Sequence, residues 1–144
     1  MQLLPKDILD TIESRLDDAI RRRLDVAPVE SLAGHVSTFT RAGGKRVRPQ
    51  LVVWTWTKAC PSQASPCEAL LDVAVAWELF HAFVLVHDDI IDASDLRRGM
   101  PTLHRSLASL DGHSPTFGKN LAIVGGDLLF AAALDVLNAI EVDP

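Results

Sequence analysis

The sequence of 144 residues predicts an all-α protein, and three observations support this. Apolar residues near the N-terminus recur every three or four positions, as on one face of a helix. Two later segments, residues 69–86 and 121–140, are apolar on almost every side, as buried helices are. No segment alternates apolar and polar residues as a half-buried strand does. The length fits a single domain over residues 1–144.

The first helix is expected from about Lys6 to Leu24. Its apolar stripe consists of residues at helical spacing: Leu9, Ile12, Leu16, Ile20 and Leu24. Pro28 favours the start of a second helix over about residues 29–41, which Gly43-Gly44 should end.

The middle of the chain predicts two further helices. One covers about residues 47–59, where Pro49 is tolerable in the first turn. After a loop bracketed by Pro61 and Pro66, a long helix near Cys67 to Ile91 is apolar around most of its circumference.

The C-terminal part of the chain is expected to contain one loop and one helix. Residues 97–110 are expected to form a loop with one short helical turn, and residues 121–140 a final apolar helix. Helices that are apolar on all sides need neighbours on all sides, and only three other helices are available. We therefore expect an uncovered apolar surface, which either a partner subunit or a larger chain would cover.

Composition excludes several classes of function. The formal net charge of -5 argues against general nucleic-acid binding. Cys60 and Cys67, in a chain without a secretion signal, indicate free thiols in a reducing compartment. The apolar run 69–86 contains Asp72, Glu78 and His81, so no membrane span is expected. We expect a soluble cytoplasmic protein.

Residues 87–98 carry four carboxylates followed by Arg97 and Arg98. Asp is a poor helix former, and negative charge at a helix C-terminus opposes the helix dipole, which favours a bound cation. On a helix, Asp88 and Asp92 lie one turn apart, on the same stripe as His81. Such oxygen ligands suit Mg²⁺ better than zinc. The alternative is a solvated helix end whose charge the two arginines neutralise.

A second cluster is Gly43-Gly44-Lys45-Arg46-Val47-Arg48-Pro49. Two glycines and three cations at a helix start are typical of an anion site. The cluster lacks the spacing and the terminal Ser or Thr of a phosphate-binding Walker loop. A basic helix N-terminus that follows a turn, or a nucleic-acid patch, remains the alternative.

These blocks together resemble the N-terminal portion of trans-isoprenyl diphosphate synthases, the polyprenyl synthetase family, of the geranylgeranyl and farnesyl type. The matching blocks, in order along the chain, are residues 43–49, 78–92, 95–104 and 125–129. Class I terpene cyclases share the Asp-rich helix but lack the Gly-Gly-Lys block and the arginine pair. The resemblance implies the N-terminal half of the isoprenoid synthase helical bundle, which is usually dimeric.

The resemblance also implies a reaction, the condensation of isopentenyl diphosphate with an allylic diphosphate. The catalytic residues would be Asp88 and Asp92, as Mg²⁺ ligands, with Asp89 in support. Arg97 would hold the allylic diphosphate. Isopentenyl diphosphate would be held by four residues: Lys45, Arg48, His81 and Arg98. Phe83 and Val84, just before the first Asp, would limit chain length and favour a C20 geranylgeranyl product over a C15 farnesyl product.

The chain departs from the family pattern in its second half. Family members run to about twice this length and carry a second Asp-rich motif, which residues 92–144 do not supply. The remaining aspartates there are isolated: Asp111, Asp127, Asp135 and Asp143. We therefore expect the 144 residues to be a partial domain that is inactive alone. A non-catalytic partner of a longer homologous synthase, and a small diphosphate-binding module, are the alternatives.

Overall fold

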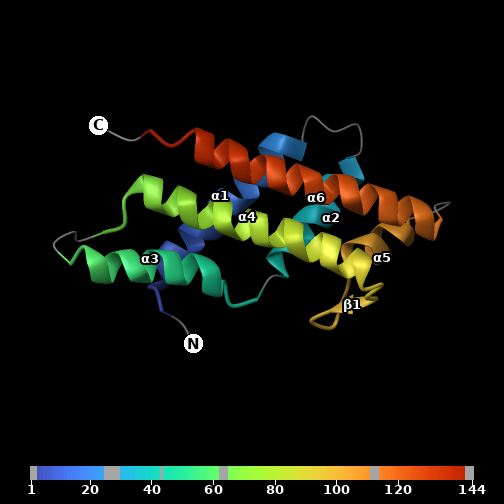
Figure 1. Ribbon diagram of the computed structural model, residues 1–144, viewed down its shortest axis with the longest axis horizontal. Coiled ribbons are helices and arrows are strands. Elements are labelled where there is room, and N and C mark those ends of the chain that lie inside the picture. Colours follow the sequence, from blue (N-terminus) through green and yellow to red (C-terminus); the bar gives the residue numbers. More distant parts are fainter. Residues whose placement is uncertain (1–2, 25–29, 43, 62–64, 111–113, 142–144) are drawn as a thin grey trace.

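The computed structural model describes residues 3–24, 30–42, 44–61, 65–110 and 114–141. These residues form six α-helices and one short hairpin, which confirms the all-α prediction (Figure 1). The elements in chain order are α1 (Lys6–Leu24), α2 (Glu30–Arg41), α3 (Val47–Ala59), α4 (Glu68–Ile91), β1 (Leu96–Arg97), β2 (Met100–Pro101), α5 (Leu103–Ala108) and α6 (Pro115–Asn138).

Helix α4 is the centre of the arrangement. It lies between α3 and α6 in one layer, and α1 and α2 lie behind that layer (Figure 1). The predicted stripe of α1 packs inward, because Ile12, Leu16 and Ile20 are buried. These residues join Leu79 of α4 and Leu129 of α6 in a single core. The site residues of α4 are therefore carried by a helix that packs against α1, α3 and α6.

The predicted start of the last helix, at residue 121, was wrong. Helix α6 begins at Pro115, and the Ser114 hydroxyl accepts a hydrogen bond from the Phe117 amide at 3.1 Å. A Ser cap followed by Pro at the first helical position is a local start signal that apolar periodicity does not detect. Gly118 lets this first turn approach α5 closely, because an added Cβ would lie 2.5 Å from the His104 carbonyl oxygen.

Residues 96–108 are also more ordered than the predicted loop with one helical turn. Strands β1 and β2 pair in antiparallel fashion around Arg98 and Gly99, which both have positive φ angles, 54° and 81°. This combination is typical of a tight two-residue hairpin turn. The Thr102 hydroxyl donates to the Ser94 carbonyl at 2.9 Å and fastens the hairpin just before α5. The hairpin holds both site arginines beside α4.

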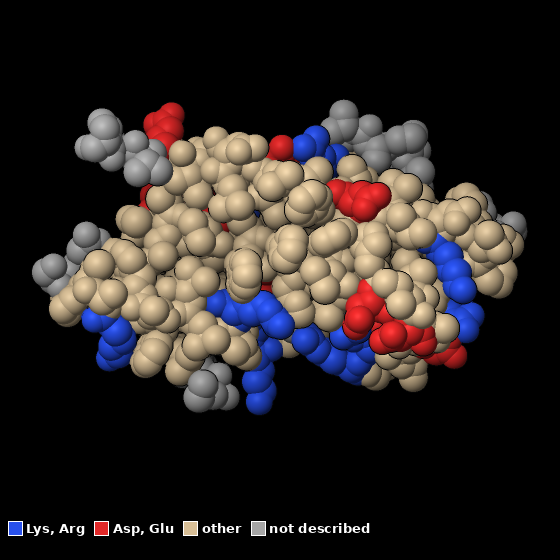
Figure 2. All heavy atoms as spheres, viewed as in Figure 1, with Lys and Arg blue, Asp and Glu red and all other residues tan. Residues whose placement is uncertain are grey.

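The expected uncovered apolar surface is present on α4 and α6. Its exposed large side chains include Val73, Trp77, Phe80, Val84, Phe130 and Leu134. Figure 2 shows this face, formed by α3, α4 and α6, as a broad surface with few charged side chains. Helices α4 and α6 are long and apolar enough to cross a membrane by length and composition alone. The core helix of a soluble protein meets the same criterion, so the expected absence of a membrane span stays a prediction.

Candidate functional site

Two accessible carboxylates lie at the C-terminal end of α4. The helix continues to Ile91 and is capped by Asp92, whose amide donates to the Asp88 carbonyl at 2.8 Å. The side chains of Asp88 and Asp92 are therefore one helical turn apart, as predicted, and both residues are exposed. Asp89 between them is only 2% exposed and points into the protein. The acidic motif thus divides into two outward carboxylates and one inward carboxylate.

The inward carboxylate fixes Arg97. The Arg97 Nε atom lies 2.8 and 3.0 Å from the two oxygens of Asp89, and Nη2 lies 2.7 Å from Oδ1. The same guanidinium also contacts Asp88, at 3.3 Å. The hydrogen bond to Asp89 is the main reason that the pKa of Arg97 is raised above its ordinary value. Arg97 is thereby held on the hairpin beside the Asp88 carboxylate.

His81 lies two helical turns before Asp88 and close to three arginines. Burial, followed by the positive charges of Arg48, Arg98 and Arg97, lowers the pKa of His81 to about 4. His81 is therefore neutral at pH 7. Within the described part of the chain, Arg98 has no carboxylate partner, and its Nη1 donates to the Ala42 carbonyl at 3.3 Å.

The basic side chains at the start of α3 point in different directions, which could not be predicted from the sequence. Arg46 has a φ angle of 47° and is 6% exposed. Its guanidinium is hydrogen-bonded to Glu13, to Glu78 at 3.0 Å and to the Thr40 carbonyl at 2.8 Å. The interpretation of three cations around an anion was therefore wrong for Arg46, which is a buried structural cation.

The other basic residues of this segment are accessible to a ligand. Lys45 and Arg48 are exposed on either side of Arg46. Gly44 has a φ angle of 82°, and a Cβ there would lie 2.9 Å from Nη1 of Arg98. Gly43 lies outside the described residues. The hairpin residue Arg98 thus packs on Gly44, next to Lys45 in the chain, and Arg48 lies close enough to His81 to lower its pKa.

The acidic end suits one class of metal ion. Mg²⁺ commonly takes one or two protein carboxylates and fills its other positions with water and phosphate oxygens. Asp88 and Asp92 fit that pattern. No group of three or more His, Cys, Asp or Glu side chains suited to a metal occurs in the described ranges. In Figure 2, acidic side chains gather beside basic ones near the end of α4 and the hairpin.

Comparison with known proteins decides the family. Residues 29–143 match the family described as polyprenyl synthetase. The chain belongs to the polyprenyl synthetase family. It is 36% identical over 140 residues to a geranylgeranyl diphosphate synthase of Methanosarcina mazei, covering 95% of this chain and 39% of that enzyme. It is also 36% identical over 129 residues to heptaprenyl diphosphate synthase component 2 of Geobacillus stearothermophilus, covering 90% of this chain and 34% of that protein.

A solved structure shares the fold of this polyprenyl synthetase chain. It is a geranylgeranyl pyrophosphate synthase from Corynebacterium glutamicum, complexed with isoprenyl diphosphate and magnesium. The TM-score is 0.73 at 33% identity, and the match covers 90% of this chain and 41% of that one. The chain therefore spans about two fifths of the length of the proteins it matches.

An aromatic cluster lies immediately before the acidic motif of this family member. The Phe83 ring is half-buried and lies 4.7 Å from the His87 ring and 5.2 Å from the Phe130 ring of α6. Val84 is exposed on the apolar surface. The sequence reasoning singled out Phe83 and Val84 but missed Phe130, because this contact joins two helices far apart in the sequence.

In the block Gly125-Gly126-Asp127, Gly126 packs against the same end of α4, and Gly125 faces α2 and α5. His87 donates through Nδ1 to the Phe83 carbonyl at 3.0 Å, and its Nε2 lies 3.5 Å from Asp127. A Cβ at Gly126 would lie 2.4 Å from the imidazole ring. Asp127 itself is exposed beside His87. The Asp135 carboxylate pairs with Arg23 at 2.6 Å, and Asp111 and Asp143 lie outside the described residues.

Proposed function

We propose that this chain is part of a prenyltransferase that condenses isopentenyl diphosphate with an allylic diphosphate. The observation that carries the proposal is the arrangement at one end of α4. An exposed carboxylate pair lies about 10 Å along the helix from a neutral His81 surrounded by arginines. A metal-binding end next to a cationic region fits two diphosphate esters. The magnesium and isoprenyl diphosphate bound by the Corynebacterium glutamicum enzyme support this proposal.

We assign the roles as follows. Asp88 and Asp92 hold Mg²⁺, which supplies Lewis-acid assistance to the departing diphosphate when bound. Asp89 supports them by fixing Arg97, whose guanidinium is directed to the allylic diphosphate. Isopentenyl diphosphate is held by the cationic group: Lys45, Arg48, His81 and Arg98. The apolar surface of α4 and α6 helps to exclude water from the reacting carbons.

Lys45 provides the direct test of the diphosphate site. Lys45→Ala should weaken the binding of isopentenyl diphosphate to this chain about tenfold, because a charge-assisted hydrogen bond is lost. In a catalytically competent form, the Michaelis constant for isopentenyl diphosphate should rise. Isothermal titration of the 144-residue chain measures the first effect. Lys58→Ala, which removes an exposed lysine beside Trp54 instead, is the matched control and should bind as wild type. Equal affinities of the Lys45 and Lys58 variants would count against the site.

Phe83 provides a test of product length, for which we propose geranylgeranyl diphosphate over farnesyl diphosphate. The Phe83→Ala variant, in a catalytically competent form, should make longer products, because truncation opens space next to Phe130. Chromatography of the hydrolysed products measures this length. Val84→Ala, at the neighbouring exposed position, should change product length less. An unchanged distribution in Phe83→Ala would remove Phe83 as a determinant.

A second candidate function is a partner of a longer homologous synthase. The exposed apolar residues of α4 and α6 favour it, as does the likeness to a protein described as component 2 of a heptaprenyl synthase. In either case we propose that residues 1–144 form one partial domain in the cytoplasm, in a homodimer or with a longer homologous chain. Native mass measurement distinguishes these cases. Co-purification with a longer homologue would favour the partner, and a stable monomer would argue against both assemblies.

A further inference from the structure

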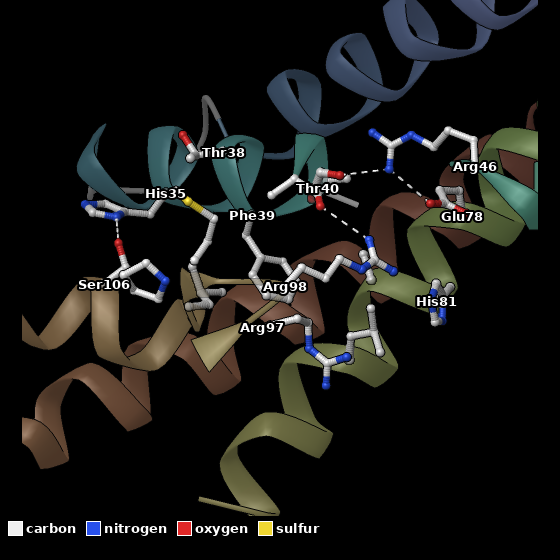
Figure 3. Close-up of a pocket in the computed structure, with 16 residues that line it drawn as sticks. His35, Thr38, Phe39, Thr40, Arg46, Glu78, His81, Arg97, Arg98 and Ser106 are labelled. Atoms are coloured by element: carbon white, nitrogen blue, oxygen red, sulfur yellow. Dashed lines mark hydrogen bonds and ion pairs between the residues drawn. The ribbon is translucent and has the colours of Figure 1, made fainter. Parts of the chain in front are cut away.

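A cavity of about 190 Å³ lies behind the cationic group, between α2, α4, α5 and the hairpin (Figure 3). Its walls are largely apolar and include Phe39, Leu85, Met100 and Pro101. Lys45, Arg48, Asp88 and Asp92 are not among its described lining residues. The cavity is therefore a compartment beside the carboxylate pair, and it shares Arg98 and His81 with the proposed isopentenyl diphosphate site and Arg97 with the acidic end.

The electrostatic character of this cavity is positive. Glu78 is the acidic side chain among its described lining residues, and Arg46 neutralises it at 3.0 Å. Arg98 extends across the cavity toward α2, as Figure 3 shows, and its guanidinium hydrogen-bonds only to a backbone carbonyl among the described residues. An unpaired guanidinium beside an apolar pocket favours an anionic group attached to an apolar body.

The size of the cavity limits the ligand. An apolar cavity of about 150 Å³ accommodates benzene, so the cavity of about 190 Å³ holds one ring with small substituents and is too small for a prenyl chain of ten or more carbons. At the end of the cavity away from His81, Ser106 and His35 are already joined at 2.6 Å and can hydrogen-bond to a polar edge. From these contacts we infer that the cavity binds a small amphipathic anion, with a compact apolar body between Phe39 and Leu85 and a carboxylate held by Arg98.

This ligand would act on the diphosphate site through Arg98. The same guanidinium packs on Gly44 and donates to Ala42, and so braces the segment that precedes Lys45. An anion that holds Arg98 in the cavity keeps its guanidinium from isopentenyl diphosphate. The two ligands should weaken each other's binding equally, as linkage requires. This coupling rests on the proposed function, whereas binding in the cavity does not.

The test uses ¹⁹F NMR titration of the 144-residue chain with 4-fluorobenzoate, and with neutral 4-fluorobenzyl alcohol for comparison. We expect the acid to bind with a dissociation constant on the order of 1 mM, as suits a ligand of this size. Ala82→Leu narrows the cavity and should weaken acid binding at least tenfold. Ala69→Leu, near the start of the same helix, is the matched control and should bind as wild type.

Arg98→Gln keeps the test valid if the Ala82 variant does not fold, because Arg98 is exposed. It should weaken binding of the acid about tenfold and leave binding of the alcohol unchanged. Equal binding of acid and alcohol to the wild type, or equal binding of the acid to wild type and Arg98→Gln, would overturn the inference. Titration with isopentenyl diphosphate tests the proposed function separately. If isopentenyl diphosphate fails to bind while the acid binds, the proposed function fails and the cavity site stands.

Discussion

Asp88→Asn should reduce the affinity of this chain for Mg²⁺ and pyrophosphate together by about a hundredfold. The carboxylate is exposed, lies one turn from Asp92 and is one of two oxygen donors at the end of α4. Its loss removes half of the protein ligands and one negative charge, and a hundredfold corresponds to about 2.8 kcal/mol. Titration of the chain with pyrophosphate at fixed Mg²⁺ measures the effect. In a catalytically competent form, turnover should fall by orders of magnitude.

The matched control for this change is Asp10→Asn, which removes one exposed carboxylate from α1, remote from α4's C-terminal end. Its affinity for Mg²⁺ and pyrophosphate should equal that of the wild type. Thermal unfolding of the Asp88 variant should also match the wild type, since the Asp88 side chain is largely solvated. If Asp88→Asn binds as well as Asp10→Asn, the carboxylate pair does not hold the metal.

Arg46→Met should destabilise the protein by about 3–5 kcal/mol, the range found when one partner of a buried ion pair is removed. The side chain of Glu78 is 6% exposed and would be left as a buried carboxylate without its cation. Such a loss is a large part of the total stability of a domain of this size. The free energy of unfolding in urea, followed by circular dichroism, measures it.

Two further variants show whether the loss arises from the uncompensated charge. Arg48→Met removes an exposed arginine two residues away and should change the free energy of unfolding by less than about 0.5 kcal/mol. In the double variant Arg46→Met with Glu78→Leu, the buried charge is gone and much of the stability should return. A loss below about 1 kcal/mol in Arg46→Met alone would show that the Arg46–Glu78 pair contributes little.

The features that could be predicted from the sequence are local ones. Periodicity placed α1 at its observed bounds, and flanking glycines and prolines placed α3. The spacing of Asp88 and Asp92 placed both on one helical turn. Two of the local errors had local signals, since Ser114-Pro115 marks the start of α6 and Arg98-Gly99 marks the hairpin turn. These features depend only on residues within a few positions of one another.

The remaining features depend on contacts between helices, and the sequence patterns do not show which helices lie side by side. The sequence Lys45-Arg46 does not indicate which of the two side chains is buried. Arg46 is buried because it binds Glu13 of α1 and Glu78 of α4, which lie far away in the sequence. The packing of Phe83 against Phe130 likewise joins α4 to α6. The motifs therefore predicted the family and the residue types of the site, but not the division of its charges into outward and inward groups.

The contacts of Arg97 with two aspartates have a consequence for how the proposed site at the end of α4 would take up a divalent cation. Three close contacts tie the guanidinium to buried Asp89, and a single longer one, at 3.3 Å, reaches Asp88. An incoming dication can therefore displace the arginine from Asp88 without detaching it from the protein. Without a cation, Arg97 partly neutralises the carboxylates at the end of α4. Once displaced from Asp88, its guanidinium stays close enough to bind an anion that accompanies the cation.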